Sequence, residues 1–300
     1  MEDRLNTKCG RVVIFGRPNT GKSTLLNAIM QQKVTVTSPM PQTTRKSIRV
    51  IYNDERGKII FIDTPGIIGK VEDLVGKSIN DEAPKEINKA EIVVMLVDIS
   101  REKSDEDNKA IGWVRKSKSK KILVYNKVDK VDKGKDYLPE YNYLEEEFDR
   151  VISVSALKEK NIKGLVNLIF ELLPEEVDES IKEEIASMEA ENKPLIGSSA
   201  EDFVAELIRE KAYLYLRREV PYSVNVEVAS IEDKGKIIVV KAFVFTTADR
   251  YKKMIIGSNG SKIKQIGYNA RKELELMSGR KIYLELEVRV DKHWPERYLI

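Results

Sequence analysis

Four short motifs with residue types suited to nucleotide chemistry follow one another along the first half of the chain. They are GRPNTGKS at 16–23, TTR at 43–45, DTPG at 63–66 and NKVD at 126–129. The first is typical of a loop in which backbone N–H groups surround phosphate oxygens. The last supplies a carboxylate that can accept hydrogen bonds from guanine N1–H and N2–H₂, a donor pair that adenine lacks. Together the motifs predict a site for GTP.

The phosphate loop is expected between an apolar strand at 11–15 and a helix at 22–31. Gly16 and Gly21 allow the backbone to turn its N–H groups inward, and the positive end of the helix dipole adds to them. Lys22 is expected to reach the β and γ phosphates. This arrangement favours an anion site over an ordinary glycine turn.

A magnesium site is expected beside the loop. Ser23 offers a hydroxyl to Mg²⁺, and Asp63, at the end of a predicted strand at 58–63, would hold the ion from the opposite side, directly or through water. Cys9 and His293 are each the only residue of their type, which excludes an internal disulfide and a histidine-based metal cluster, and leaves no candidate Ser-His-Asp triad in the GTPase region.

The base is expected to contact residues at the ends of two further strands. Asp129 would accept from guanine, and Lys127 would lie along the ring. Asn126 would either donate to the base or tie its loop to the phosphate loop. In the segment SVSAL at 153–157, the backbone N–H of Ala156 would meet guanine O6.

A second domain is expected after the acidic stretch at 175–191. Its pattern is a helix beginning at Ser199, strands at 222–231 and 236–245, a helix at 261–277 and a strand at 282–290. The segment IGSNG, between two predicted helices, is the signature loop of KH domains, and the order helix, strand, strand, helix, helix, strand is that of the prokaryotic type. A KH domain binds single-stranded nucleic acid.

Basic residues concentrate around this loop, with seven of them between positions 249 and 272, although the whole chain carries a net charge of only +3. Phosphate contacts from these residues would give affinity, and apolar side chains would form a floor for bases. The residues expected to bind RNA are Ile255, Ile256, Gly257, Ser258, Asn259, Gly260, Lys262, Ile263, Lys264, Arg271 and Trp294. Trp294 would either stack on a base or anchor the tail.

These motifs resemble the Era family of GTPases, and the resemblance covers nearly the whole chain. It implies that Thr44, with Thr43 the less suitable neighbour, closes over Mg²⁺ and the γ-phosphate, and that Gly66 donates its N–H to that phosphate. The segments 32–47 and 64–80 would be the two switches. The implied nucleotide contacts are Gly16, Arg17, Pro18, Asn19, Thr20, Gly21, Lys22, Ser23, Thr24, Asp63, Thr64, Pro65, Gly66, Asn126, Lys127, Asp129, Ser155, Ala156 and Leu157.

Hydrolysis is expected to be slow without help, because Ile67 follows DTPG where Ras-like enzymes carry a glutamine that orients water. In related GTPases an asparagine at the position of Asn19 holds a potassium ion that replaces an arginine finger. We therefore expect Lys22, Thr44, Gly66 and Asn19 to support catalysis. The alternative is that Asn19 only shapes the turn.

The resemblance implies a partner, the 3′ region of 16S ribosomal RNA, and a role in 30S subunit assembly. A GTPase acting in RNA modification and an RNA-binding module with a regulatory nucleotide site are the alternatives. No apolar stretch approaches the length of a membrane span and the N-terminus lacks a signal-peptide core, so we expect a cytoplasmic protein. We also expect it to be a monomer. A peripheral contact with the inner face of the membrane is kept open.

The expected fold class is α/β. A P-loop GTPase domain at 1–178, with a mixed but mostly parallel sheet covered by helices on both faces, would be followed by a solvated, partly helical acidic linker at 179–198. A smaller α+β KH domain of type II, with its tail, would occupy 199–300.

Overall fold

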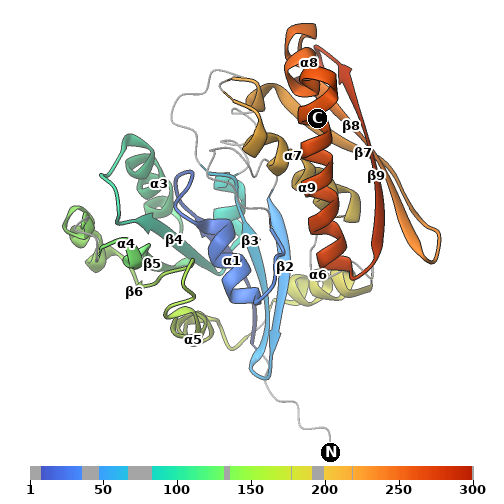
Figure 1. The fold of residues 1–300 in the computed structure, drawn as a ribbon. Helices are drawn as coiled ribbons and strands as arrows, with labels where there is room; N and C mark the ends of the chain where they lie inside the picture. Colours follow the sequence, from blue (N-terminus) through green and yellow to red (C-terminus); the bar gives the residue numbers. More distant parts are fainter. Residues whose placement is uncertain are drawn as a thin grey trace, which may run out of the picture. The chain divides into compact units, whose positions relative to one another are not determined.

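The computed structural model describes residues 8–35, 47–66, 83–131, 136–176, 178–190, 199–217 and 219–298. The chain forms two compact units, which divide between residues 197 and 198. Each unit carries its own sheet and its own helices (Figure 1).

The N-terminal unit is built on a six-stranded sheet with the strand order β2-β3-β1-β4-β5-β6. All neighbours are parallel except β2 and β3, which form an antiparallel hairpin. The strands are β1 (Lys8–Phe15), β2 (Ile48–Asp54), β3 (Gly57–Asp63), β4 (Ile92–Asp98), β5 (Lys120–Asn126) and β6 (Arg150–Ser153). The predicted mixed, mostly parallel sheet is confirmed.

Helices cover both faces of this sheet, as expected for strands that are apolar throughout. One core joins alternate strand residues such as Val13 and Met95 to α3 (Asp105–Lys116) and to the short helix at 83–89. On the other face, α1 (Lys22–Met30) contacts α5 (Ile162–Leu172). Shorter helical segments complete the unit: α4 (Val128–Val131), η1 (Leu138–Glu140) and η2 (Asn142–Glu147).

The acidic segment after α5 is helical over 179–190, which agrees with the partly helical linker predicted, but it is packed on the N-terminal unit rather than solvated throughout. It forms α6 (Glu179–Ala190), whose Ile181 and Ile185 are buried in the core of the N-terminal unit. Arg11 of β1 pairs with Glu184 at 2.7 Å. The helix buries one apolar stripe and exposes most of its acids, so most of its acidic residues lie on the outer face. Residues 191–198 lie outside the described part.

The C-terminal unit has the predicted order of helix, two strands, two helices and strand. Ser199 begins α7 (Ala200–Tyr215), and its hydroxyl accepts from the backbone N–H of Asp202 at 3.1 Å. The sheet order is β7-β8-β9, with β7 and β8 antiparallel and β8 and β9 parallel. The remaining elements are η3 (Pro221–Ser223), β7 (Val224–Asp233), β8 (Ile237–Thr246), α8 (Asp249–Ile256), η4 (Ser258–Gly260), α9 (Ser261–Ser278), β9 (Lys281–Val290) and η5 (Trp294–Tyr298).

Candidate nucleotide and RNA sites

Four parallel strands end at one edge of the large sheet and bring together residues that are far apart in the sequence. The phosphate loop begins at Gly16 after β1, and Asp63, Asp98 and Asn126 end β3, β4 and β5. The register pairs Ile14 with Asp63 and Asp98 with Asn126. Ligands of open α/β sheets bind at this carboxyl edge.

The glycines of the phosphate loop are required by both conformation and space. Gly16 has φ 152° and Gly21 has φ 102°, backbone angles that side chains disfavour. A Cβ on Gly16 would lie 2.4 Å from Leu96 O, and one on Gly21 would lie 2.5 Å from Asn126 Nδ2. The loop is therefore a close-fitting backbone cradle, as predicted.

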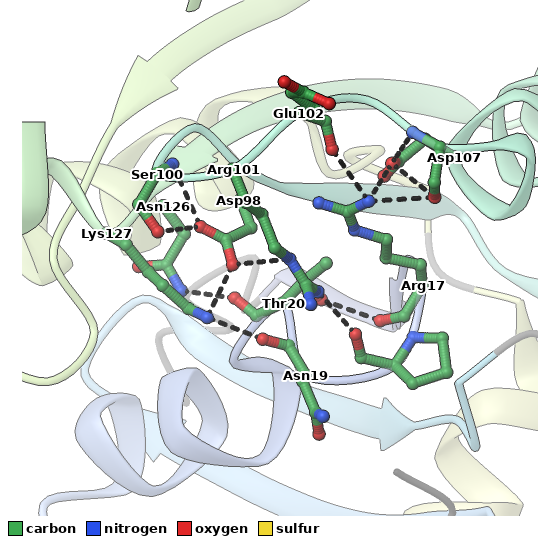
Figure 2. Close-up of polar contacts among 12 residues, drawn as sticks. Arg17, Asn19, Thr20, Asp98, Ser100, Arg101, Glu102, Asp107, Asn126 and Lys127 are labelled. Atoms are coloured by element: carbon green, nitrogen blue, oxygen red, sulfur yellow. Dashed lines mark hydrogen bonds and ion pairs between the residues drawn. The ribbon is translucent and has the colours of Figure 1, made fainter. Parts of the chain in front are cut away.

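Side chains donate hydrogen bonds to five consecutive backbone carbonyls of this loop, and Figure 2 shows several of these bonds. Lys22 Nζ donates to Gly16 O at 3.0 Å and Arg17 O at 2.9 Å, Arg101 to Pro18 O at 2.7 Å, Lys127 Nζ to Asn19 O at 2.7 Å, and Asn126 Nδ2 to Thr20 O at 2.8 Å. In a trans peptide the C=O and the next N–H point in opposite directions. The N–H groups of Asn19, Thr20 and Gly21 thus point away from Arg101, Lys127 and Asn126, as an anion cradle requires. Pro18 has no N–H to contribute.

The charges at the mouth of the loop are buried and only partly compensated. Burial lowers the pKa of Lys22 to about 8, against the opposing effect of Asp63. Burial also raises the pKa of Asp63 to about 6, although its Oδ2 accepts from Ser23 Oγ at 2.7 Å. Asp63 Oδ1 is buried and has no hydrogen-bond partner among the described residues. A phosphate beside Lys22 and a cation beside Asp63 would stabilise both charged forms.

The base-reading segments meet at Asn126. Its side chain donates to Thr20 O and accepts from the backbone N–H of Ala156 at 3.0 Å, so it ties the loops together, one of the two predicted roles. In this structure that N–H is engaged with Asn126, and its contact with guanine O6 stays a prediction. Asp129 Oδ1 accepts from Ser155 Oγ at 2.5 Å. The hydrogen bond from Ser155 fixes the position of the Asp129 carboxylate, which the sequence predicts to contact guanine.

Three other predicted contact residues have partners within the protein. The Arg17 side chain is 4% exposed and lies 2.7 Å from Asp107 of α3, so it turns away from the phosphate cradle and leaves only its backbone there. Gly66 packs against Pro18, where a Cβ would lie 2.7 Å from the proline Cα. Thr64 is buried, and its hydroxyl donates to Ile14 O at 2.9 Å.

Some predicted residues fall outside the described part of the structure. Thr43 and Thr44 lie within 36–46, and Ile67 lies within 67–82. These ranges include most of both predicted switches. The roles assigned to Thr44 and Ile67 stay predictions.

The KH signature forms a tight loop between α8 and α9. Gly257 has φ 73° and Gly260 has φ 76°, and Asn259 between them has φ 51°. A Cβ on Gly257 would lie 2.9 Å from Lys262 Cγ. The loop leads directly into the N-terminus of the long helix α9, where the helix dipole favours phosphate.

A groove of about 280 Å³ adjoins this loop between α9 and β9. Its lining combines apolar and basic side chains: Ile263, Lys264, Gly267, Tyr268, Arg271, Leu284 and Leu286. Gly267 keeps the groove open, because a Cβ there would already lie 3.3 Å from Leu286 Cδ1. Arg271 Cζ lies 5.6 Å from the centre of the Tyr268 ring. The Nε atom of Arg271 is buried and has no hydrogen-bond partner among the described residues.

Two predicted RNA contacts are placed elsewhere. Ile255 is fully buried, so it packs in the core of the KH unit and cannot form part of a floor for bases. Trp294 is 2% exposed, and its indole N–H donates to Ser223 O at 3.1 Å. A ring covered in this way cannot stack on a base, which favours the anchoring alternative. Ile256 is partly exposed, and Ile263 lines the groove.

Two family models match the chain in the order of its two units. A model described as 50S ribosome-binding GTPase matches residues 11–127, and a KH domain model matches residues 219–295. The GTPase Era of a Thermoanaerobacter species (strain X514) is 37% identical over 291 residues, which cover 96% of this chain and 92% of the relative. The chain belongs to the GTPase Era family.

Solved Era structures share the fold over nearly the whole length. The crystal structure of Aquifex aeolicus Era bound to GDP·AlF4⁻ has a TM-score of 0.86 and 32% identity, and it covers 98% of both chains. Era in complex with MgGDPNP and nucleotides 1506–1542 of 16S ribosomal RNA also has a TM-score of 0.86 and 32% identity, with 98% and 97% covered. The expected α/β GTPase fold followed by a KH domain is confirmed.

Several residues of the Era-type sites escape sequence reasoning. Asp98 ends β4 and Arg101 follows it, and neither belongs to a motif, although a polar residue at the end of an apolar strand marks the ligand-binding edge. Gly267, Tyr268 and Leu286 line the KH groove but stand outside the signature loop. These residues are recognised as groove lining only once α9 and β9 are packed together, because Leu286 is far from the other two in the sequence.

Within the described residues, no helix is long and apolar enough to cross a membrane. The same part of the chain contains no group of three or more His, Cys, Asp and Glu side chains that could hold a metal ion. A magnesium ion bound by one carboxylate, one hydroxyl and phosphate oxygens needs no such group.

Proposed function

We propose that this Era-family GTPase binds and hydrolyses GTP at the edge of its large sheet and binds single-stranded 16S ribosomal RNA through its KH groove during 30S subunit assembly. The observation that carries the nucleotide part is the double contact of Asn126, which joins the phosphate loop to the base-reading segment. The RNA part is supported by the relative solved with a 16S RNA segment.

The residues of the site divide the work by chemistry. The N–H groups of the loop and Lys22 bind the phosphates, and the phosphates replace at least one of the two carbonyls that Lys22 contacts. Asp129 accepts from the guanine edge, in the position set by Ser155. Ser23 and Asp63 are the residues that would hold Mg²⁺, which when bound neutralises phosphate charge. The unpartnered Asp63 Oδ1 fits that role.

The RNA would enter the groove between α9 and β9. Lys264 and Arg271 provide positive charge beside an apolar floor, and the exposed Tyr268 ring can stack on a base. The tight backbone at Gly257 and Gly260 allows phosphates to approach the N-terminus of α9. Binding to the 30S subunit, membrane contact and the monomeric state stay predictions.

The nucleotide assignment is tested by Asp129→Asn. The amide keeps one acceptor for N1–H but places its N–H₂ donor opposite guanine N2–H₂, which also donates, whereas xanthine offers the acceptor O2 at that position. We expect GTP affinity to fall by about 10- to 100-fold, because a two-point base contact contributes on the order of 1–3 kcal/mol. Titration with fluorescent GTP and XTP measures both affinities. Unchanged preference for GTP over XTP would contradict the assignment.

The RNA site is tested by Gly267→Val, which fills the groove without removing a charge. We expect the affinity for an RNA of the 1506–1542 segment to fall by about tenfold or more, because one stacked base contributes on the order of 1–3 kcal/mol. The control is Gln265→Val, at an exposed position of α9 outside the groove lining. Fluorescence anisotropy measures both variants, and equal affinities would place the RNA elsewhere.

A further inference from the structure

A buried carboxylate lies at the centre of a charged cluster next to the phosphate loop (Figure 2). Asp98 is 1% exposed. Its Oδ1 accepts from the backbone N–H and the hydroxyl of Ser100 at 3.0 and 2.7 Å. Its Oδ2 lies 2.6 Å from Lys127 Nζ and 2.9 Å from Arg101 Nε. Both oxygens are thus engaged with groups of the protein.

The two cations that Asp98 holds also contact the phosphate loop. Arg101 donates to Pro18 O at 2.7 Å, and Lys127 Nζ donates to Asn19 O at 2.7 Å. The N–H groups that follow these carbonyls, on Asn19 and Thr20, point the opposite way. The Asp98 carboxylate therefore contacts two cations, and these cations contact the loop whose N–H groups would face the phosphates.

We propose that Asp98 is a positioning residue for nucleotide binding, which acts by fixing Arg101 and Lys127 so that together they orient the phosphate loop. In this arrangement Arg101, which belongs to none of the four motifs, holds the loop through its hydrogen bond to Pro18 O. Lys127 connects the same carboxylate to the base-reading segment, since Asp129 follows it by two residues. The inference deepens the proposed function and depends on it.

The chemistry of the two cations suits this arrangement. The planar guanidinium of Arg101 forms an ion pair with Asp98, with Nε 2.9 Å from Oδ2 but without hydrogen-bond geometry, while a terminal nitrogen donates to Pro18 O at 2.7 Å. A lysine at the same position would be a point charge on a flexible stem. A loop held in its binding conformation loses less entropy when the nucleotide binds.

The pKa of Asp98 agrees with a carboxylate that stays ionised. Burial by itself raises it, but hydrogen bonds from Lys127 and Ser100 outweigh burial and bring it below the usual value. The charge is thus available at neutral pH to hold both cations.

The test measures dissociation constants of the full-length protein for GDP, GMP, GTP and ITP. The ratio of the GMP to the GDP constant reports the phosphate contribution, and the ratio of the ITP to the GTP constant reports recognition of the guanine amino group. In Arg101→Met we expect the phosphate ratio to fall by about tenfold, the size of a charge-assisted hydrogen bond, while the base ratio stays unchanged. In Asp98→Asn we expect both ratios to fall.

Two further variants separate positioning from charge. Arg101→Lys keeps the positive charge but loses the planar guanidinium, so the phosphate ratio should stay low. If lysine restores it, the effect is electrostatic and the proposed positioning is wrong. In Asp98→Asn combined with Arg101→Met, the phosphate ratio should fall no further than in Asp98→Asn alone, because both changes remove one chain of contacts. Additive losses would contradict the proposal.

The control is Arg115→Met, which removes a half-exposed arginine that pairs with Glu147 at 2.6 Å. We expect this variant to keep both ratios. If Asp98→Asn lowers the melting temperature but keeps both ratios, its role is only structural and the proposal fails. If the wild-type protein itself shows no preference for GTP over ITP and ATP, the proposed function fails instead.

Discussion

At the scale of single residues, the nucleotide site holds charges that the protein itself only partly compensates. Burial brings the pKa of Lys22 down to about 8 and that of Asp63 up to about 6. Each shift moves the residue toward its neutral form. A bound phosphate and a bound cation would reverse both shifts, so binding of the ligand also completes the pairing of these charges.

Asn19 carries a prediction about catalysis. It has φ 63°, an angle that glycine adopts freely and asparagine tolerates. Asn19→Gly therefore removes the side-chain oxygen without straining the turn. If that oxygen holds potassium as a substitute for an arginine finger, the wild-type protein should hydrolyse GTP at least about tenfold faster in potassium than in sodium, and the variant should lose this difference.

Single-turnover rates in the two salts measure the effect, and GTP affinity serves as the control. Equal wild-type rates would remove the potassium role and leave Asn19 as a turn residue. A variant that keeps the potassium effect would assign it to another residue.

At the scale of elements, α6 changes the expected boundary of the GTPase unit. Ile181 and Ile185 lie one helical turn apart, and both are buried in its core. We predict that Ile185→Ala lowers the free energy of unfolding of this unit by about 2–4 kcal/mol, as for other buried isoleucines. Ser187→Ala, on an exposed position of the same helix, should change it little.

Urea denaturation followed by circular dichroism distinguishes the two cases. Equal stability of the Ile185 and Ser187 variants would support the solvated linker that composition predicts. A lower midpoint for Ile185→Ala alone would establish α6 as a part of the fold.

Elements that carry their own local signal could be predicted from the sequence. The phosphate loop needs glycines at fixed positions, the KH loop needs two more, and the strands are continuous apolar runs, so these were placed correctly. Contacts between distant elements could not be predicted. The partners of Asp98, the burial of Ile255 and the cover over Trp294 depend on packing, which periodicity alone does not reveal.

At the scale of the whole molecule, the chain joins a nucleotide-binding unit to an RNA-binding unit. We propose that the nucleotide governs how strongly the KH groove holds RNA. A ligand shifts an equilibrium only by its differential affinity for two states, and coupling between two binding sites is reciprocal. RNA should therefore increase the affinity for a GTP analogue by the same factor by which the analogue increases the affinity for RNA.

The most direct test measures the dissociation constant of one RNA, the 1506–1542 segment, for protein saturated with GDP and for protein saturated with a non-hydrolysable GTP analogue. We predict tighter binding with the analogue by about tenfold, a coupling free energy of about 1.4 kcal/mol. Equal dissociation constants in the two nucleotide states would contradict the claim that this protein is a GTP-controlled RNA-binding switch.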